Sequence, residues 1–225
     1  MKTDLTIMFT LWNRCPERFE YFKETVESFK KNITISKYSI KWIASIEPKD
    51  HLLKTETENF CRDNNIIFYY KPGHPNLGSN LNFGLSKCDS DYIFYLQDDW
   101  KLNRQINLDD DIDFLKQHDD IYVLRYWFCL IKPFENYVDE KLKIKLLDPK
   151  TGFYYCADNP HLKKASYHKI TGPYYDKGDS AECENFMADR AGKLSDKYKI
   201  SVKEENNYFQ HIGSKSSMFE KQKND

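Results

Sequence analysis

Short apolar runs alternate with amphipathic, charge-rich stretches through the first half of the chain, and this alternation constrains the fold more than any other feature. The runs that we predict as strands are Leu5–Leu11, Ser39–Ile46, Ile66–Tyr70 and Tyr92–Leu96. Helices are predicted from Pro16 onward, over about 51–64 and within 76–88. Strands that alternate with helices pair in parallel, with helices on both faces. The pattern therefore predicts an α/β domain around a mostly parallel, Rossmann-like central sheet.

The second half of the chain is less regular, and its predicted elements are shorter. We predict a strand over Ile121–Ile131, a hairpin excursion over 132–160, helices over Leu162–Lys169 and Ala181–Leu194, and one or two short strands over Lys199–Ile212. No internal repeat or linker divides the chain. We therefore expect one domain over 1–212, followed by a flexible tail over 213–225 that is rich in Ser and Lys.

Composition excludes several classes of protein. The 34 Lys and Arg residues nearly balance 35 Asp and Glu residues, which argues against a broadly basic nucleic-acid binder. No apolar run approaches the roughly 20 residues that cross a bilayer, and the N-terminus lacks the cleavage site of a signal peptide. The six cysteines lie far apart, as in a reducing compartment, so a cytoplasmic location is expected. The eight glycines form no dinucleotide-binding or P-loop motif.

Two adjacent carboxylates, Asp98 and Asp99, follow the predicted strand Tyr92–Leu96 after the single residue Gln97. Like charges at a strand end repel, and a fold has little reason to place them there without a cation. Mg²⁺ and Mn²⁺ bind through one or two carboxylates together with substrate phosphates. The structural alternative is a solvated turn. The acidic run 109–111 differs, because it follows no strand and starts a predicted helix, where acidic side chains suit the helix dipole.

The acidic pair belongs to a series of motifs. In chain order these are Asn13-Arg14 after the first predicted strand, Asn76-Leu77-Gly78-Ser79-Asn80-Leu81-Asn82, and Tyr92-Ile93-Phe94-Tyr95-Leu96-Gln97-Asp98-Asp99-Trp100. Their order and spacing resemble family 2 glycosyltransferases of the GT-A fold, in which the last segment is the DxD motif. The resemblance extends to Asn159-Pro160-His161-Leu162, to Glu184 and Arg190, and to His211-Ile212-Gly213. It thus spans nearly the whole chain.

The resemblance implies a nucleotide-sugar donor, a UDP-sugar such as UDP-glucose, held at the ends of the first three strands. The residues that match the nucleotide-binding positions are Thr10, Leu11, Trp12, Asn13, Arg14, Glu47, Lys71, Asn76, Gly78, Asn82 and Asp98. Among these, Gly78 would let the backbone approach the donor and Asn82 would offer its amide. Loop and helix-cap chemistry is the structural alternative for the asparagines.

The resemblance also implies a metal ion. Asp99 would bind Mn²⁺, or Mg²⁺, directly, and Asp98 would contact the ribose or a metal-bound water. His211 matches a late histidine that completes the site, and imidazole suits Mn²⁺ better than Mg²⁺. Lys215 and Ser216 would then fold over the diphosphate, a mobile tail being the alternative.

A catalytic base is the remaining requirement for transfer to a hydroxyl group. The family places this base near a helix start, six residues before an Arg. Glu184 has that spacing to Arg190, so we predict that Glu184 is the base, with Glu182 in reserve, and that the anomeric centre is inverted. Helix-start acids also serve as dipole partners, which is the alternative for both glutamates.

The acceptor side is less defined. Trp100 and the pair Tyr126-Trp127 are candidates for an aromatic platform against a sugar ring, and residues 153–160 are expected to face the acceptor. The acceptors that we expect are glycans or glycoproteins, viral glycoproteins included, without nucleic acid and without a membrane span. The resemblance also admits a chain that is part of a larger multidomain glycosyltransferase.

Two departures from the family pattern keep other functions open. Gln97 stands where the motif usually has an acid, and Ile46-Glu47-Pro48-Lys49 replaces the usual Asp-Asp-Gly-Ser. A non-catalytic module that binds carbohydrate or nucleotide sugar is therefore one alternative. A sugar-1-phosphate nucleotidyltransferase is another, but that class needs a Gly-rich loop with Arg after the first strand, which residues 10–16 lack.

Overall fold

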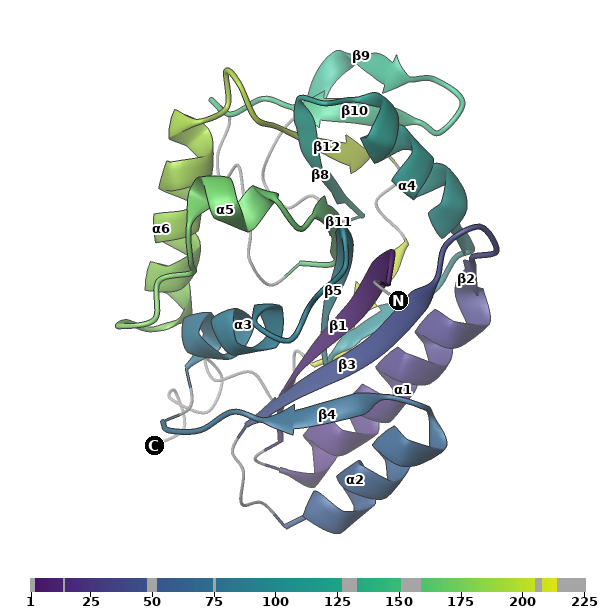
Figure 1. Cartoon of the computed structure of the whole chain (residues 1–225), viewed down its shortest axis with the longest axis vertical. Coiled ribbons are helices and arrows are strands. Elements are labelled where there is room, and N and C mark those ends of the chain that lie inside the picture. The colour runs from purple at the N-terminus through teal and green to yellow at the C-terminus, as the bar shows by residue number, and fades with distance from the viewer. Residues whose placement is uncertain are drawn as a thin grey trace.

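The computed structural model of the chain describes residues 3–13, 15–47, 52–74, 76–126, 133–150, 159–204 and 208–213. A nine-stranded sheet in the order β4-β3-β1-β5-β11-β8-β12-β10-β9 runs through the molecule (Figure 1). Its strands are β1 (Leu5–Trp12), β3 (Ile40–Glu47), β4 (Ile67–Tyr70), β5 (Tyr92–Gln97), β8 (Ile121–Arg125), β9 (Pro133–Asp139), β10 (Ile144–Leu147), β11 (His161–Lys164) and β12 (Lys199–Lys203). The predicted α/β class with helices around a central sheet is confirmed.

Parallel pairing is concentrated in one part of the sheet. Strands β4, β3, β1 and β5 are parallel neighbours, and β12 is parallel to β8. Strand β11 joins β5 and β8 antiparallel, and β10 pairs antiparallel with both β12 and β9. Two small two-stranded sheets complete the structure: β2 (Ile33–Thr34) with β7 (Ile106–Asn107), and β6 (Trp100–Leu102) with β13 (Phe209–His211).

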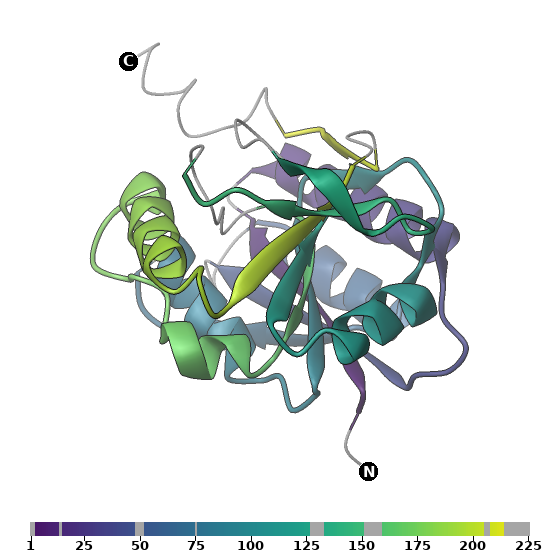
Figure 2. The same ribbon diagram turned by 90° about the horizontal axis from the view of Figure 1, so that it is seen from above.

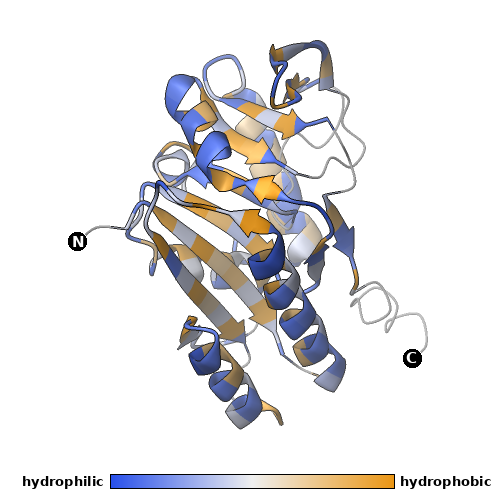
Figure 3. Ribbon diagram, turned by 90° about the vertical axis from the view of Figure 1, so that its right-hand side faces the viewer, coloured by the Kyte–Doolittle hydropathy of each residue, from blue (hydrophilic) through white to orange (hydrophobic). Residues whose placement is uncertain are grey.

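Helices cover both faces of the large sheet. They are α1 (Pro16–Asn32), α2 (Lys54–Asp63), α3 (Leu77–Leu85), α4 (Leu108–Gln117), α5 (Tyr167–Thr171) and α6 (Ser180–Lys193). Seen from above, α5 and α6 lie on one side of the sheet and α1 and α4 on the other (Figure 2). In Figure 3 the strands are mainly orange and the outward faces of the helices mainly blue. Apolar side chains are thus concentrated between the layers.

The residues of β1 divide between two cores. Leu5, Ile7, Phe9 and Leu11 pack in the core beneath α1, α2 and α4, whereas Met8 faces the opposite core, beneath α3, α5 and α6. This alternation follows from the two-residue period of a strand. Because both faces are covered, the strand reads in the sequence as one continuous apolar run.

Helix α1 begins where the sequence predicts. Pro16 occupies its first position, where the missing N–H costs nothing, and Lys30 and Lys31 lie in its last turn, next to the negative end of the helix dipole. Phe22, Val26 and Phe29 of this helix are fully buried. The helix therefore packs on the sheet with its N-terminus near the carboxyl end of β1, from which it follows directly.

One predicted element is wrong. Residues Leu162–Lys169 were expected to form a helix, but His161–Lys164 form strand β11, and only Tyr167–Thr171 form the short helix α5. Strand β11 completes two ladders at once, with β5 and with β8, and Leu162 and Lys163 are buried on opposite faces. Pairing on both sides in the middle of a sheet outweighs the modest helix preference of Leu and Lys.

Other expectations for the second half can be compared directly. Strands β9 and β10 form the predicted hairpin, α6 matches the predicted helix, and β12 and β13 are the predicted short strands. The acidic run 109–111 starts α4 as predicted, and its Asp111 is buried against Lys203 Nζ at 2.7 Å. Of the tail predicted over 213–225, Gly213 is described, and residues 214–225 lie outside the described residues. Within the described ranges, every helix is too short or too polar to cross a membrane.

Candidate active site

Parallel strands bring the residues that follow β1, β3 and β5 to one edge of the sheet. In the register of the ladder, Trp12 lies beside Glu47 and Thr10 lies beside Gln97. The acidic pair, which follows Gln97, therefore meets the carboxyl ends of β1 and β3. This is the edge at which open α/β sheets bind ligands.

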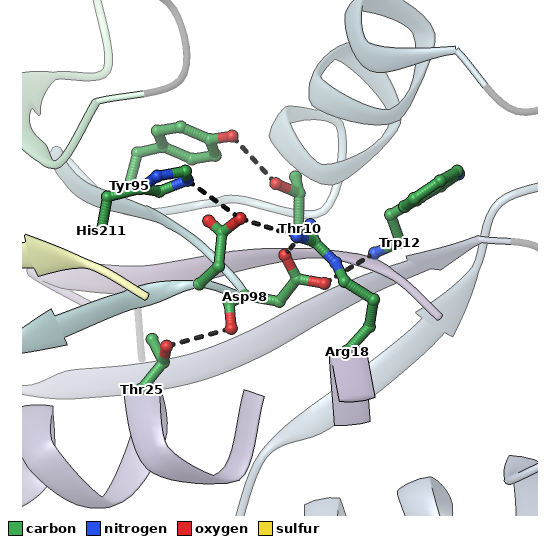
Figure 4. Close-up of polar contacts among 8 residues, drawn as sticks. Thr10, Trp12, Arg18, Thr25, Tyr95, Asp98 and His211 are labelled. Atoms are coloured by element: carbon green, nitrogen blue, oxygen red, sulfur yellow. Dashed lines mark hydrogen bonds and ion pairs between the residues drawn. The ribbon is translucent and has the colours of Figure 1, made fainter. Parts of the chain in front are cut away.

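Asp98 and Asp99 are buried at this edge, with exposed fractions of 1% and 4%. The backbone N–H of Trp12 donates to Asp98 Oδ2 at 3.1 Å, and Thr25 Oγ1 in α1 donates to the carbonyl oxygen of Asp98 at 3.0 Å (Figure 4). These bonds join the acidic pair to β1 and α1. The two carboxylates are thus held by the fold, and the solvated turn that was the structural alternative does not describe them.

Arg18, in the first turn of α1, contacts both carboxylates. Its Nη1 donates to Asp99 Oδ2 at 2.7 Å, and its Nη2 donates to Asp98 Oδ1 at 2.5 Å. The guanidinium also lies 5.6 Å from the centre of the Trp12 ring. Sequence reasoning missed Arg18, because Pro-Glu-Arg in a first helical turn gives no sign of a partner some eighty residues later in the chain.

Strand β13 brings His211 to the acidic pair. The antiparallel register places His211 opposite Trp100, and the two rings lie 5.0 Å apart. His211 Nε2 lies 3.2 Å from Asp99 Oδ2, and the backbone N–H of Ile212 donates to the carbonyl oxygen of Asp99 at 2.9 Å. Two residues that are 112 positions apart in the chain therefore meet.

Gly213 lies directly over Asp99. A Cβ at Gly213 would lie 2.2 Å from Asp99 Oδ2 and 2.7 Å from Asp99 Cβ, so a larger residue would force the two segments apart. The histidine and the glycine of the late motif thus act together: Gly213 lets the backbone close over the carboxylate while His211 reaches it from the side.

The electrostatics differ between the two carboxylates. Burial raises the pKa of Asp98 to about 7, an effect that the neighbouring Asp99 adds to and Arg18 opposes. Burial acts in the same direction on Asp99, but the hydrogen bond with His211 and the charge of Arg18 hold its pKa below the usual value. Two carboxylates this close titrate as a pair, and Asp99 is the member that keeps its charge most readily.

The chemistry of these groups fits a divalent cation. Within the described ranges, Asp99 Oδ1 is buried and makes no hydrogen bond, so one hard oxygen lacks a partner. Asp99 and His211 together offer an oxygen and an imidazole nitrogen, and no described group of three such side chains forms a fuller cage. Mg²⁺ and Mn²⁺ sites that also bind phosphates commonly use this few protein ligands.

Several residues predicted to bind the nucleotide are buried in this structure. Leu11 belongs to the core beneath α1, Thr10 Oγ1 is bonded to Tyr95 Oη at 2.9 Å, and Asn13 Nδ2 donates to Thr57 Oγ1 at 2.7 Å. These three side chains are therefore buried inside the protein, whereas Trp12 is partly exposed at the carboxyl edge of the sheet. Arg14 lies outside the described residues.

Glu47 and Lys71 form a second charged pair at the same edge, at the ends of β3 and β4. Their Oε2 and Nζ atoms lie 3.6 Å apart, and both residues are buried. Asn76 joins this pair through its backbone N–H, which lies 3.3 Å from Glu47 Oε2. Glu47 thus lies at the carboxyl end of β3, the second of the predicted strands.

The asparagine motif docks the segment that precedes α6. Asn76 caps α3 by accepting from the backbone N–H of Ser79, and its Nδ2 donates to the carbonyl oxygen of Gly178. Both amide atoms of Asn82 are bonded to the backbone of Tyr174. Gly78 is needed because a Cβ there would lie 1.9 Å from the carbonyl oxygen of Tyr175. These contacts are with protein backbone, where the resemblance led us to expect contacts with a donor.

The two glutamates of α6 have different environments. Glu182 is exposed and belongs to a capping box, in which its Oε2 accepts from the backbone N–H of Asp179 at 3.0 Å. Glu184 lies two residues further along the helix and is partly buried, with its Oε1 shielded from solvent. Arg190 packs over Gly172 and over the ring of Phe186. The dipole-partner alternative therefore describes Glu182 and not Glu184.

The aromatic candidates are mostly core residues. Trp100 is buried behind His211, and Tyr126 is fully buried with its hydroxyl donating to Asp111 Oδ2 at 2.6 Å. Neither ring is available to a sugar in this structure. Trp127, residues 153–158, Lys215 and Ser216 lie outside the described residues.

A buried arginine that the sequence did not single out lies on the same sheet. Arg125 ends β8, beside His161 of β11, and has an exposed fraction of 1%. Over the part of the chain that the structure describes, none of its three guanidinium nitrogens makes a hydrogen bond. A buried charge without a partner is costly, so Arg125 is, after Arg18, a second buried arginine that sequence reasoning did not single out.

Comparisons with known proteins identify the fold. No protein-family model matches the chain, and no curated protein matches it in sequence. Residues 1–349 of TarS from S. aureus share the fold with a TM-score of 0.65 and 15% identity, over 93% of this chain and 60% of that one. The complex of that fragment with UDP-GlcNAc gives a TM-score of 0.64 at 15% identity, over 94% and 61% of the two chains.

The longer TarS structure gives a TM-score of 0.66 at 14% identity, over 96% of this chain and 38% of that one. The chain thus spans about 60% of the length of TarS 1–349 and 38% of the length of the longer TarS structure. TarS is a glycosyltransferase of GT-A-like fold. The architecture described above is thus a GT-A-like α/β fold, with the acidic pair at the carboxyl edge of its sheet.

Proposed function

We propose that the chain is a metal-dependent, inverting glycosyltransferase that moves a sugar from a UDP-sugar to a hydroxyl group of a glycan or protein-linked acceptor. One observation carries the proposal: in a GT-A-like fold, His211 meets the buried pair Asp98 and Asp99 at the carboxyl edge of the parallel strands. A fold alone hosts many functions, so the argument depends on the chemistry of this edge.

The donor would bind across the ends of β1, β3 and β4. Trp12 offers a partly exposed ring at this edge, and Glu47 and Lys71 offer a charged pair that can exchange partners with a nucleotide. TarS has been crystallised with UDP and with UDP-GlcNAc, which supports a uridine nucleotide as the first donor to test. Arg14, Lys215 and Ser216 stay predicted donor contacts.

Asp99 and His211 are the residues that would hold Mn²⁺, or Mg²⁺, and a bound cation would neutralise the negative charge that develops on the diphosphate leaving group. Asp98 is committed to the backbone of Trp12 and to Arg18, so its role would be to orient the ribose-binding strand end. Gly213 and Ile212 would keep the histidine against the carboxylate.

Glu184 would act as the base. It would accept the proton of the acceptor hydroxyl as that oxygen bonds to the anomeric carbon, while the bond from this carbon to the diphosphate oxygen breaks. Attack from the face opposite the leaving group inverts the anomeric centre. Asn76 supports this assignment, because it joins both Glu47 at the donor side and Gly178 before α6, so the base helix is tied to the donor edge.

The experiment is a panel of nucleotides and nucleotide sugars, each with Mn²⁺ and with chelator, measured by thermal unfolding and by product analysis. A donor at 100 times its dissociation constant should stabilise the fold by about 2.7 kcal/mol, and only with the cation. Transfer or slow hydrolysis of that donor should follow the same dependence. Stabilisation without any turnover would instead indicate a binding module, and no response to any nucleotide would refute the proposal.

A further inference from the structure

We propose that Arg18 is a resident counter-cation of the acidic pair, and that a divalent cation binds Asp99 only by displacing the guanidinium of Arg18. The inference deepens the proposed function, and it rests on that function in locating a cation at Asp99 and His211. It assigns to Arg18 control over cation affinity, which neither the motifs nor the fold comparison assigns to any residue.

The first observation is the geometry of the three side chains. A single guanidinium bridges the two carboxylates, with one nitrogen on each, at 2.5 and 2.7 Å. All three residues are buried, with Arg18 exposed by only 8%. One positive charge thus lies between two negative charges, and this pairing explains how the fold tolerates two adjacent buried carboxylates.

The second observation is that Arg18 and the expected cation need the same atom. Arg18 Nη1 is bonded to Asp99 Oδ2, which is also the oxygen that lies 3.2 Å from His211 Nε2. A cation between Asp99 and His211 would bind this oxygen or the adjacent Oδ1. It would then lie within a few ångströms of the guanidinium, and two positive charges at that separation in a buried site repel strongly.

The third observation is that the present pairing is incomplete. Across the described residues, Arg18 Nε and Asp99 Oδ1 are both buried and both lack a hydrogen-bond partner. Buried polar atoms without partners are destabilising, so this arrangement is one that a better-matched ligand can replace. A cation on Asp99 would satisfy the orphaned oxygen directly.

The guanidinium also has another position within reach. Arg18 lies in the first turn of α1, at the end of the helix that faces the carboxyl edge, and its guanidinium is already 5.6 Å from the centre of the Trp12 ring. An aromatic face attracts a cation, and arginine does so more often than lysine. Once displaced from Asp99, the guanidinium can move along this ring and keep its contact with Asp98.

The test measures Mn²⁺ binding without any donor, by electron paramagnetic resonance of the free ion, in the wild-type chain and in Arg18→Met. Removal of the resident cation should tighten Mn²⁺ binding by about 10- to 100-fold, the range over which groups beside metal ligands tune affinity. Arg62→Met is the matched control, because Arg62 pairs with Glu58 on the exposed face of α2. Unchanged or weaker Mn²⁺ binding in Arg18→Met would overturn the inference.

Two further variants keep the test decisive. Arg18→Lys retains a positive charge with a single contact, so its Mn²⁺ affinity should lie between those of the wild type and Arg18→Met; an affinity equal to the wild type counts against displacement. Arg18→Met with Asp98→Asn restores the charge balance if the single variant unfolds, and should bind Mn²⁺ tightly. Adding Asp99→Asn to Arg18→Met should abolish the gain in Mn²⁺ affinity, and this loss would show that the ion binds at Asp99. Because no donor is used, tightened Mn²⁺ binding alongside absent sugar transfer would support the Arg18 inference and refute the proposed function.

Discussion

Asn82 and Tyr174 are joined by two hydrogen bonds: the backbone N–H of Tyr174 donates to Asn82 Oδ1 at 2.8 Å, and Asn82 Nδ2 donates to the carbonyl oxygen of Tyr174 at 2.9 Å. The side-chain amide of Asn82, in α3, thus makes the two hydrogen bonds to the Tyr174 backbone that a neighbouring strand would otherwise make. Tyr174 lies 92 positions later in the chain. Tyr174 precedes α6, so Asn82 positions the helix that carries Glu184.

We expect Asn82→Ala to lower turnover by about 10- to 100-fold, because a base displaced by about an ångström loses that much. Donor affinity should hardly change, since both amide atoms of Asn82 are bonded to the backbone of Tyr174. Stability should fall by about 1–3 kcal/mol from the unpaired backbone groups. The measurements are kcat and the donor KM, with Asn59→Ala on the exposed face of α2 as the control. A raised donor KM with unchanged kcat would show instead that Asn82 binds the donor.

Glu184→Gln and Glu182→Gln should separate catalysis from helix capping. If Glu184 is the base, its variant should lose about 10²–10⁴-fold in turnover while it binds donor normally. Glu182→Gln keeps the capping geometry and should lose less than about tenfold in turnover, with a stability change within the range of about 0.5–2 kcal/mol seen for helix caps. Transfer rates and the product anomer, read by NMR, check both. Equal losses in the two variants, or a retained anomer, would contradict the assignment.

His211→Ala should weaken Mn²⁺ binding, since it removes the imidazole nitrogen that lies beside Asp99. The expected loss is about 10- to 100-fold. The variant should stay folded, because the side chain of His211 is 39% exposed and β13 is held to β6 by backbone bonds. Calorimetric titration with Mn²⁺ measures the effect, and His118→Ala, at the C-terminal end of α4, is the control. Wild-type Mn²⁺ affinity in His211→Ala would make the histidine structural.

The buried side chain of Lys163, which is not part of the proposed metal site, leads us to predict that the stability of the fold depends on pH. Its side chain is buried in β11 with Nζ 3.1 Å from Tyr174 Oη, and burial lowers the pKa of Lys163 to about 7. The unfolded chain, with a pKa near 10.4, binds more protons between these values, so this residue should raise stability as pH increases from about 7 to 10. The slope should not exceed about 1.4 kcal/mol per pH unit.

Urea unfolding of the wild type and of Lys163→Met over that pH range checks the sign, because other titrating groups cancel in the difference. The free energy of unfolding of the wild type should increase relative to that of Lys163→Met as pH rises. A constant difference would mean that Lys163 keeps its charge when buried.

Local pattern was sufficient for much of the fold and for part of the site. The apolar runs of β1, β3 and β5 could be read directly, because these strands are largely buried and their apolar residues are therefore nearly continuous in the sequence. Strand β4 could be read from its β-branched and aromatic residues, although it lies at the edge of the sheet and is only partly buried. The position of Asp98 and Asp99 after β5 followed from the same reading. Strand β11 could not be found this way, since its four residues are strand only by virtue of two neighbours that are distant in sequence.

The sequence by itself determined which residues end up at the carboxyl edge, because strand order along the chain and a common strand direction are enough to bring Trp12, Glu47 and Asp98 together. Only the tertiary structure decided what those residues contact. Arg18 reaches both carboxylates, and Asn82 turns to Tyr174, because helices pack on the sheet at angles and depths set by the whole core. Side-chain partners across such distances depend on that packing, which no local period encodes.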